Sequence, residues 1–94
     1  MRVVLSEEGL RAAADLGVTR QQIKAALASG QRLVEEIDEH TRAVTGRLDD
    51  ALITVWCVEL DDDEWEVATA FSAGTAVQIK WNHFFGGSSP DAEG

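Results

Sequence analysis

The chain has 94 residues, of which 45% are hydrophobic, and this composition predicts one small folded domain and excludes a disordered chain. Its formal net charge of −9 argues against free-standing affinity for a nucleic-acid backbone, since like charges repel at long range. Residues 1–47 hold seven basic and seven acidic side chains, so the whole negative excess falls after residue 47. An acidic surface of this kind indicates either a solvated face or a patch for a basic partner.

The single cysteine, Cys57, lies within an apolar run, and we interpret it as a small buried hydrophobe. One cysteine cannot build a disulfide framework, so a reducing cytoplasm is the expected compartment. No apolar window is long enough to cross a bilayer, and the first apolar run is too short for a secretory signal. We therefore expect a cytoplasmic protein that does not enter the membrane.

The first third of the chain predicts a short strand and two helices. Arg2–Leu5 has strand character, and Ser6 is a suitable cap for a helix that ends at Gly17. Thr19 and Gln22 form a capping box that begins a second helix, which ends before residue 30. The buried faces of the two helices are expected to hold Leu10, Ala13, Ala14, Ile23, Ala26 and Leu27.

The rest of the chain predicts strands that are separated by acidic turns. The clearest pattern is a hairpin within Ala51–Ser72, whose first run is apolar on both faces and is expected to be a central strand. Two weaker strands, Gln31–Ile37 and Thr41–Leu48, precede the hairpin, and alternating apolar residues predict a last strand over Thr75–Trp81. Residues 86–94 are interpreted as a flexible polar tail.

Together these elements predict a single α+β domain over residues 1–85. In this fold a short strand and two helices pack on a twisted antiparallel sheet of four to five strands. The aromatic residues near its end, Trp81, Phe84 and Phe85, are expected to pack either against this chain or against a second copy, so a homodimer remains open.

No motif in the chain is typical of metal or cofactor binding. It has no glycine-rich phosphate loop, no zinc-ligand spacing and no nucleophile elbow. The acidic turn Asp61–Glu64 lacks the ligand spacing and the glycine of a calcium loop. We therefore expect neither a metal nor a cofactor.

Four polar residues on or beside the predicted strands are candidates for a site. Arg42 and Arg47 are five positions apart, so strict alternation places them on opposite faces of a sheet. His40 lies in a turn and has an unperturbed pKa near neutrality, which suits general acid–base chemistry. The hydroxyl of Thr69 is expected on the same strand face as Trp65, Val67 and Phe71.

The order of these motifs resembles a group of small bacterial domains related to the RelE/BrnT-like toxins of toxin–antitoxin systems. The resemblance spans about residues 4–72. It is carried by Gly17-Val18-Thr19 with Ile23, Ala26-Leu27-Ala28-Ser29-Gly30, Arg42-Ala43-Val44-Thr45-Gly46-Arg47, the apolar run Leu52–Val58, the acidic turn Asp61–Glu64, and Val67-Ala68-Thr69-Ala70-Phe71.

The resemblance implies a barnase/RelE-like fold and a metal-independent ribonuclease activity on RNA. On this basis Arg42 and Arg47 bind phosphate, and Thr69 and His40 assist the reaction of the 2′-hydroxyl. An antitoxin is the partner that the resemblance implies, while the acidic charge favours a basic partner. The histidine that often begins the first helix in this family falls on Glu8 in this sequence.

Two alternatives remain open. The first is a non-catalytic protein-binding module or regulatory subunit on the same fold, which uses the acidic hairpin turn. The second is a helix-turn-helix DNA-binding regulator that presents Arg20, Gln21, Gln22 and Lys24 from the second helix.

Overall fold

The computed structural model describes residues 2–48 and 51–85, and in this part of the chain five strands and three helices form an α+β fold. The sheet order is β1-β5-β4-β3-β2. The strands are β1 (Arg2–Leu5), β2 (Leu33–Glu36), β3 (Thr41–Leu48), β4 (Ala51–Asp61) and β5 (Glu64–Ser72). The helices are α1 (Glu7–Leu16), α2 (Arg20–Ala28) and α3 (Thr75–Phe85). The predicted turn at Asp49 and Asp50 and the predicted tail over 86–94 lie outside the described residues.

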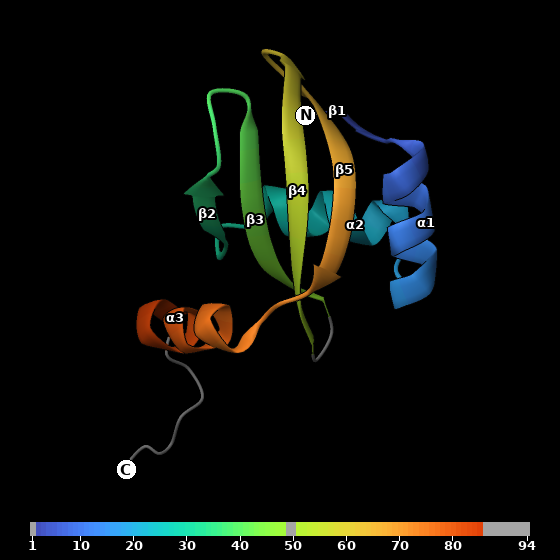
Figure 1. The fold of residues 1–94 in the computed structure, drawn as a ribbon. Coiled ribbons are helices and arrows are strands. Elements are labelled where there is room, and N and C mark those ends of the chain that lie inside the picture. Colours follow the sequence, from blue (N-terminus) through green and yellow to red (C-terminus); the bar gives the residue numbers. More distant parts are fainter. Residues whose placement is uncertain (1, 49–50, 86–94) are drawn as a thin grey trace.

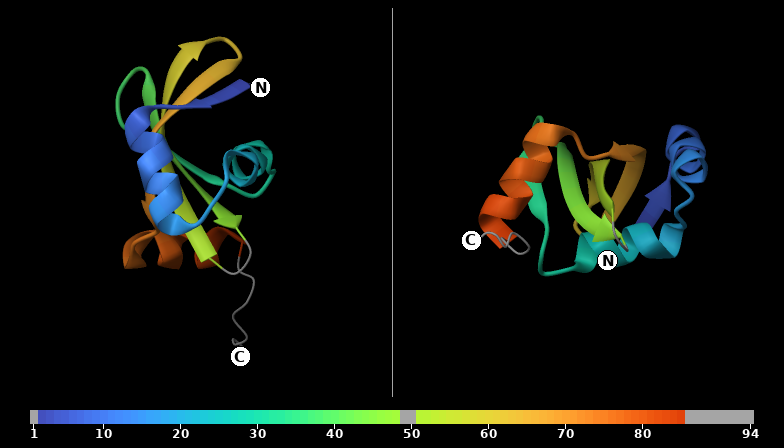
Figure 2. Two further views of the ribbon diagram at one scale, coloured as in Figure 1. Left: turned by 90° about the vertical axis from the view of Figure 1, so that its right-hand side faces the viewer. Right: turned by 90° about the horizontal axis from the view of Figure 1, so that it is seen from below.

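The helices lie on three sides of the sheet (Figures 1 and 2). α2 crosses one face, α1 runs beside β5, and α3 lies against the opposite face, at the end away from the β4–β5 turn. The predicted antiparallel sheet is confirmed for β2 through β5, while β1 pairs with β5 in parallel. No helix in the described ranges is long and apolar enough to cross a membrane.

Local capping explains why the first two helices begin where the sequence predicts. Ser6 Oγ accepts a hydrogen bond from the backbone N–H of Gly9 at 3.0 Å, which satisfies one orphan donor of α1. The predicted capping box of α2 is present, with Thr19 and Gln22 bonded reciprocally. α1 ends at Gly17, whose φ of 72° lies in the left-handed region that glycine adopts without strain.

Alternation along the central strands gives the sheet two different faces. The α2 face, which packs on α1 and α2, carries the buried side chains Val44, Ile53, Val55, Cys57 and Val67. The α3 face carries Ala43, Thr45, Thr54, Trp56, Thr69 and Phe71. β4 is central, as predicted. The side of β4 that belongs to the α3 face is covered at one end only. Thr54 at that end is 4% exposed, whereas Trp56 is 37% exposed.

The predicted buried face of α1 is wrong at two positions, because Leu10 and Ala14 are both exposed. Leu10 is 57% exposed, whereas Gly9 is buried beside the carbonyl oxygen of Val67. A β-carbon at Gly9 would overlap this oxygen, so glycine is what allows α1 to approach β5 closely. Leu10 follows Gly9 by one position, about 100° around the helix, and points toward solvent.

The predicted last strand over Thr75–Trp81 is wrong, because this segment forms helix α3. Its first helical hydrogen bond runs from Gln78 N to the oxygen of Gly74 at 3.0 Å. Alternation of Val77, Ile79 and Trp81 suggested a strand, but Val77 and Trp81 are also four apart, as on one helix face. That face turns toward the sheet and buries Trp81, while Ile79 on the other side is 64% exposed.

Candidate functional site

The predicted phosphate ligand Arg42 lies on the α2 face and is already engaged by acidic and aromatic neighbours. Its guanidinium group lies 3.8 Å from Glu36 Oε2 and 3.8 Å from Glu59 Oε1. The same group sits over the ring of Trp65, 5.2 Å from its centroid. Two carboxylates therefore compete with any incoming phosphate at Arg42.

Arg47 lies on the other face of the sheet, which confirms the opposite placement that alternation predicts. The register between β3 and β4 is regular through Gly46, so no bulge brings the two arginines together. Its guanidinium carbon lies 5.9 Å from the ring centroid of Trp81 on α3. Among the described residues no carboxylate lies within ion-pair distance of Arg47. A polar hollow of about 380 Å³ beside it is also lined by Ser72, Gln78 and Asn82.

Thr69 lies on the α3 face, whereas Trp65 and Val67 lie on the α2 face, so the predicted grouping of these residues is wrong. A register shift explains the difference: Cys57 is opposite Val67, but Trp56 is opposite Thr69, which leaves Ala68 as an extra residue. Each residue after the bulge therefore points to the face opposite to the one that simple alternation predicts.

His40 lies in the turn before β3, far from Arg47 near the end of the same strand. Seven residues of strand span roughly 23 Å at about 3.3 Å per residue. His40 is exposed, and its Nε2 atom lies 3.8 Å from Glu39 Oε1. The four predicted site residues therefore do not meet. Only Arg47 and Thr69 share a face, and Arg42 and His40 lie elsewhere.

The residues predicted to read DNA form a separate basic cluster. Arg20, Gln21 and Lys24 line a hollow of about 280 Å³ beside β1, together with Arg2. Arg2 is also 3.7 Å from Glu64 Oε2. These side chains are solvent-exposed on α2 and at the sheet edge, and DNA reading by them stays a prediction.

Two acidic turns meet at the end of the sheet away from α3, and we call residues 36–40 and 59–64 the acidic end (Figure 1). A hydrogen bond of 2.8 Å from Glu59 N to the oxygen of His40 joins the two segments. The Asp38 carboxylate accepts hydrogen bonds from the backbone N–H groups of His40 and Thr41, both at 2.9 Å. The bond from His40 is the main cause that lowers the pKa of Asp38, so this carboxylate stays charged.

The acidic end also exposes two apolar side chains among its carboxylates. Ile37 is 42% exposed and Leu60 is 51% exposed. In the described part of the chain, no three His, Cys, Asp or Glu side chains are grouped so that they could hold a metal ion. The arrangement is therefore suited to contact with a protein surface that is basic and partly apolar.

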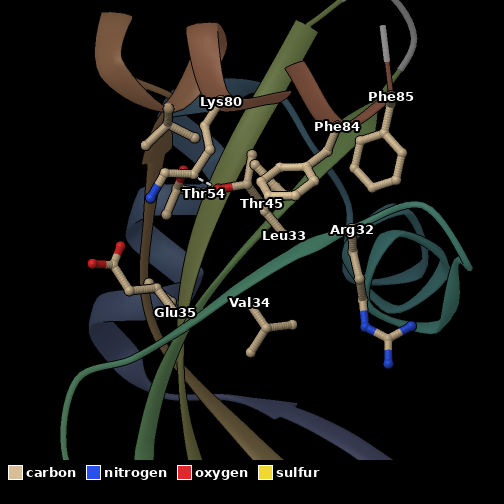
Figure 3. A pocket seen from close by; sticks show the side chains of 11 residues that line it. Arg32, Leu33, Val34, Glu35, Thr45, Thr54, Lys80, Phe84 and Phe85 are labelled. Carbon is tan, nitrogen blue, oxygen red and sulfur yellow. Dashed lines mark hydrogen bonds between the residues drawn. The ribbon is translucent and has the colours of Figure 1, made fainter. Parts of the chain in front are cut away.

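At the opposite end, α3 and the α3 face line an open pocket of about 460 Å³ (Figure 3). Its apolar walls come from the sheet and from α3, and they are Leu33, Val34, Ala43, Val77, Phe84 and Phe85. Thr45 and Thr54 lie at its floor, and Arg32, Glu35 and Lys80 complete the lining. This pocket was not predicted from the sequence, because Thr75–Trp81 was expected to form a strand and not the helix that provides one wall. The four-residue spacing of Val77, Trp81 and Phe85 was the signal that could have found it.

The buried thiol of Cys57 belongs neither to the acidic end nor to the α3 pocket. It lies in the core at 1% exposure, and burial raises its pKa to about 12. A thiol with so high a pKa is almost fully protonated at neutral pH and is a poor nucleophile. The interpretation of Cys57 as a small buried hydrophobe is confirmed.

Comparison of the chain with protein-family models, with curated proteins and with solved structures gives no match.

Proposed function

We propose that this chain is a non-catalytic protein-binding module that takes a basic partner at its acidic end. The observation that carries the proposal is the combination of carboxylates and exposed apolar side chains on adjoining turns. The carboxylates there are Glu36, Asp38, Glu39, Glu59, Asp61, Asp62, Asp63 and Glu64. The negative charge of this surface attracts a basic partner, and Ile37 and Leu60 provide apolar area that is buried on contact.

The acidic end is also held in shape before any partner arrives. The two hydrogen bonds to Asp38 fix the β2–β3 turn, and the bond from Glu59 N to His40 fixes that turn against β4. A surface that is ordered in the free protein loses less conformational entropy when it binds. Within this surface Arg42 lies near Glu36 and Glu59, and Arg2 lies near Glu64.

The experiment is a pull-down with matched charge and apolar variants. Asp61→Asn/Asp62→Asn and Leu60→Ser are expected to lose a basic partner, and moderate salt is expected to release it from the wild type. The controls are Glu7→Gln/Glu8→Gln, with the same charge change on α1, and Leu10→Ser, whose leucine is 57% exposed. A partner that all four variants retain equally, or that stays bound in high salt, would contradict the proposal.

A ribonuclease of RelE/BrnT-like type is the second candidate, and one observation favours it. Arg47 has no carboxylate nearby in the described ranges, shares the α3 face with Thr69, and borders a polar hollow that can accept a phosphate group. Arg42, by contrast, is held between two glutamates. The candidate therefore rests on Arg47 far more than on Arg42.

Inducible expression in a bacterial host tests this second candidate directly. If the chain cleaves RNA at this face, the wild type arrests growth and fragments total RNA, and Arg47→Ala abolishes both effects. Arg42→Ala is the matched comparison and is expected to retain most of the activity. Healthy growth and intact RNA with folded wild-type protein would remove the ribonuclease candidate.

A further inference from the structure

The floor of the α3 pocket holds a buried hydroxyl proton that has no acceptor among the described residues. Thr45 Oγ1 and Thr54 Oγ1 are 2.8 Å apart and share one hydrogen bond. The two hydroxyls carry two protons, and one bond uses only one of them. Thr45 and Thr54 are 3% and 4% exposed, so the remaining proton is in a site where an unmade hydrogen bond is costly.

The walls of the pocket are suited to an apolar molecular body. Phe84 from α3 lies over the threonine pair in Figure 3, and Leu33, Val34 and Val77 contribute aliphatic surface. A volume of about 460 Å³ lies within the range of roughly 300–1,000 Å³ that small-molecule pockets occupy. Apolar walls with a few directed polar groups are the usual composition of such a pocket.

The charges at the pocket favour one negative charge on the ligand. Lys80 lines the pocket, and no ion pair joins its ammonium group to a carboxylate in the described part of the chain. Figure 3 shows the Lys80 side chain reaching down beside the threonine pair, whereas Arg32 points away from it and donates a hydrogen bond to the Ser29 oxygen. Glu35 also lines the pocket, and its carboxylate would repel a second negative charge.

We propose that this pocket binds a small monocarboxylic acid with an aliphatic or aromatic body. One carboxylate oxygen accepts the free hydroxyl proton of the Thr45–Thr54 pair, and the ammonium group of Lys80 neutralises the charge. The body packs among Leu33, Val77 and Phe84. A charge-assisted hydrogen bond to the buried threonine pair is stronger than one between neutral groups, so the carboxylate is expected to decide affinity. The site is at the far end of the sheet from the acidic end and does not rest on the proposed function.

The test is titration by NMR and calorimetry with benzoate, phenylacetate and octanoate, with benzyl alcohol as the neutral comparison for benzoate. The carboxylates are expected to shift the resonances of Thr45, Thr54 and Phe84 and to bind at least tenfold more tightly than benzyl alcohol. No binding of any carboxylate at millimolar concentration would overturn the proposal. Equal binding of benzoate and benzyl alcohol would overturn it too.

Variants separate a ligand role from a structural role. Lys80→Met and Thr45→Val/Thr54→Val are expected to weaken benzoate binding at least tenfold, while Thr54→Ser, which keeps the hydroxyl, is expected to bind as the wild type does. Lys24→Met on α2 is the matched control and is expected to bind as the wild type does. The valine pair has a similar shape, so the melting temperature is expected to stay near that of the wild type. Wild-type affinity in the Lys80 and valine variants would overturn the proposal.

Discussion

The two faces of the sheet differ in how completely helices cover them. On the α2 face, α1 and α2 cover a core in which Ile23, Val55 and Val67 are at most 2% exposed. On the α3 face, one helix covers one end only, and Trp56 and Phe71 remain 37% and 42% exposed. The comparison indicates that the first face provides most of the stability, while the second has surface left for binding.

The largest expected effect comes from truncating the centre of the α2 face. Ile23→Ala is expected to lower the free energy of unfolding by about 3–4 kcal/mol, because a fully buried side chain is lost and a cavity remains. Phe71→Ala on the α3 face removes more atoms but is expected to cost less than about 1.5 kcal/mol, since its side chain is already partly hydrated. Urea unfolding measures both. Similar costs for the two variants would show that the faces contribute equally.

The next effect concerns Trp81, the one buried residue of α3. Trp81→Ala is expected to release α3 from the sheet and to lower the free energy of unfolding by about 2–3 kcal/mol. This is less than the ~3–5 kcal/mol usual for truncation of a buried tryptophan, because α3 packs against one end of the sheet only. Amide hydrogen exchange is the measurement. Exchange should quicken in α3 and remain slow in β4 and α2. A uniform increase throughout the sheet would indicate instead that α3 is part of the main cooperative core.

The smallest effect is a pH dependence of the α2 face. The pKa of Cys57 is raised from 9.0 to about 12, so the folded state binds this proton more tightly than the unfolded state. The stabilisation that the protonated thiol contributes to the folded state is fully present below pH 9 and is lost as pH rises toward 12. Between pH 8 and 10 the free energy of unfolding should fall by about 1.4 kcal/mol from this group. Urea unfolding of wild type and Cys57→Ala isolates it, because only the wild type should show this part of the decline.

The elements that depend on interactions between residues close together in the sequence were predicted correctly. The caps of α1 and α2 and the hairpin of β4 and β5 were predicted because Ser6, Thr19, Gln22 and the alternating strand residues act on near neighbours. The parallel pairing of β1 with β5 was not predicted, since it joins residues that are far apart in the sequence, such as Leu5 and Val67.

The candidate sites were predicted less well, for two physical reasons. The bulge at Ala68 leaves no pattern in the sequence, yet it moves Thr69 to the face opposite Val67. The segment after Gly74 fits both a two-residue and a four-residue period, and burial of Trp81 against the sheet selects the helix. The α3 pocket depends on that choice and was therefore missed.

The pairing of β1 with β5 also bears on how the chain acquires its structure during synthesis. Of the five described strands, β1 leaves the ribosome first, and its partner residues Glu64–Val67 belong to the strand that leaves last. Until they emerge, β1 has no strand beside it, and the buried stripe of α2 lacks part of the sheet that covers it. We therefore expect that the first half of the chain does not fold independently, and that nascent chains that stop before β5 remain protease-sensitive and depend on chaperones.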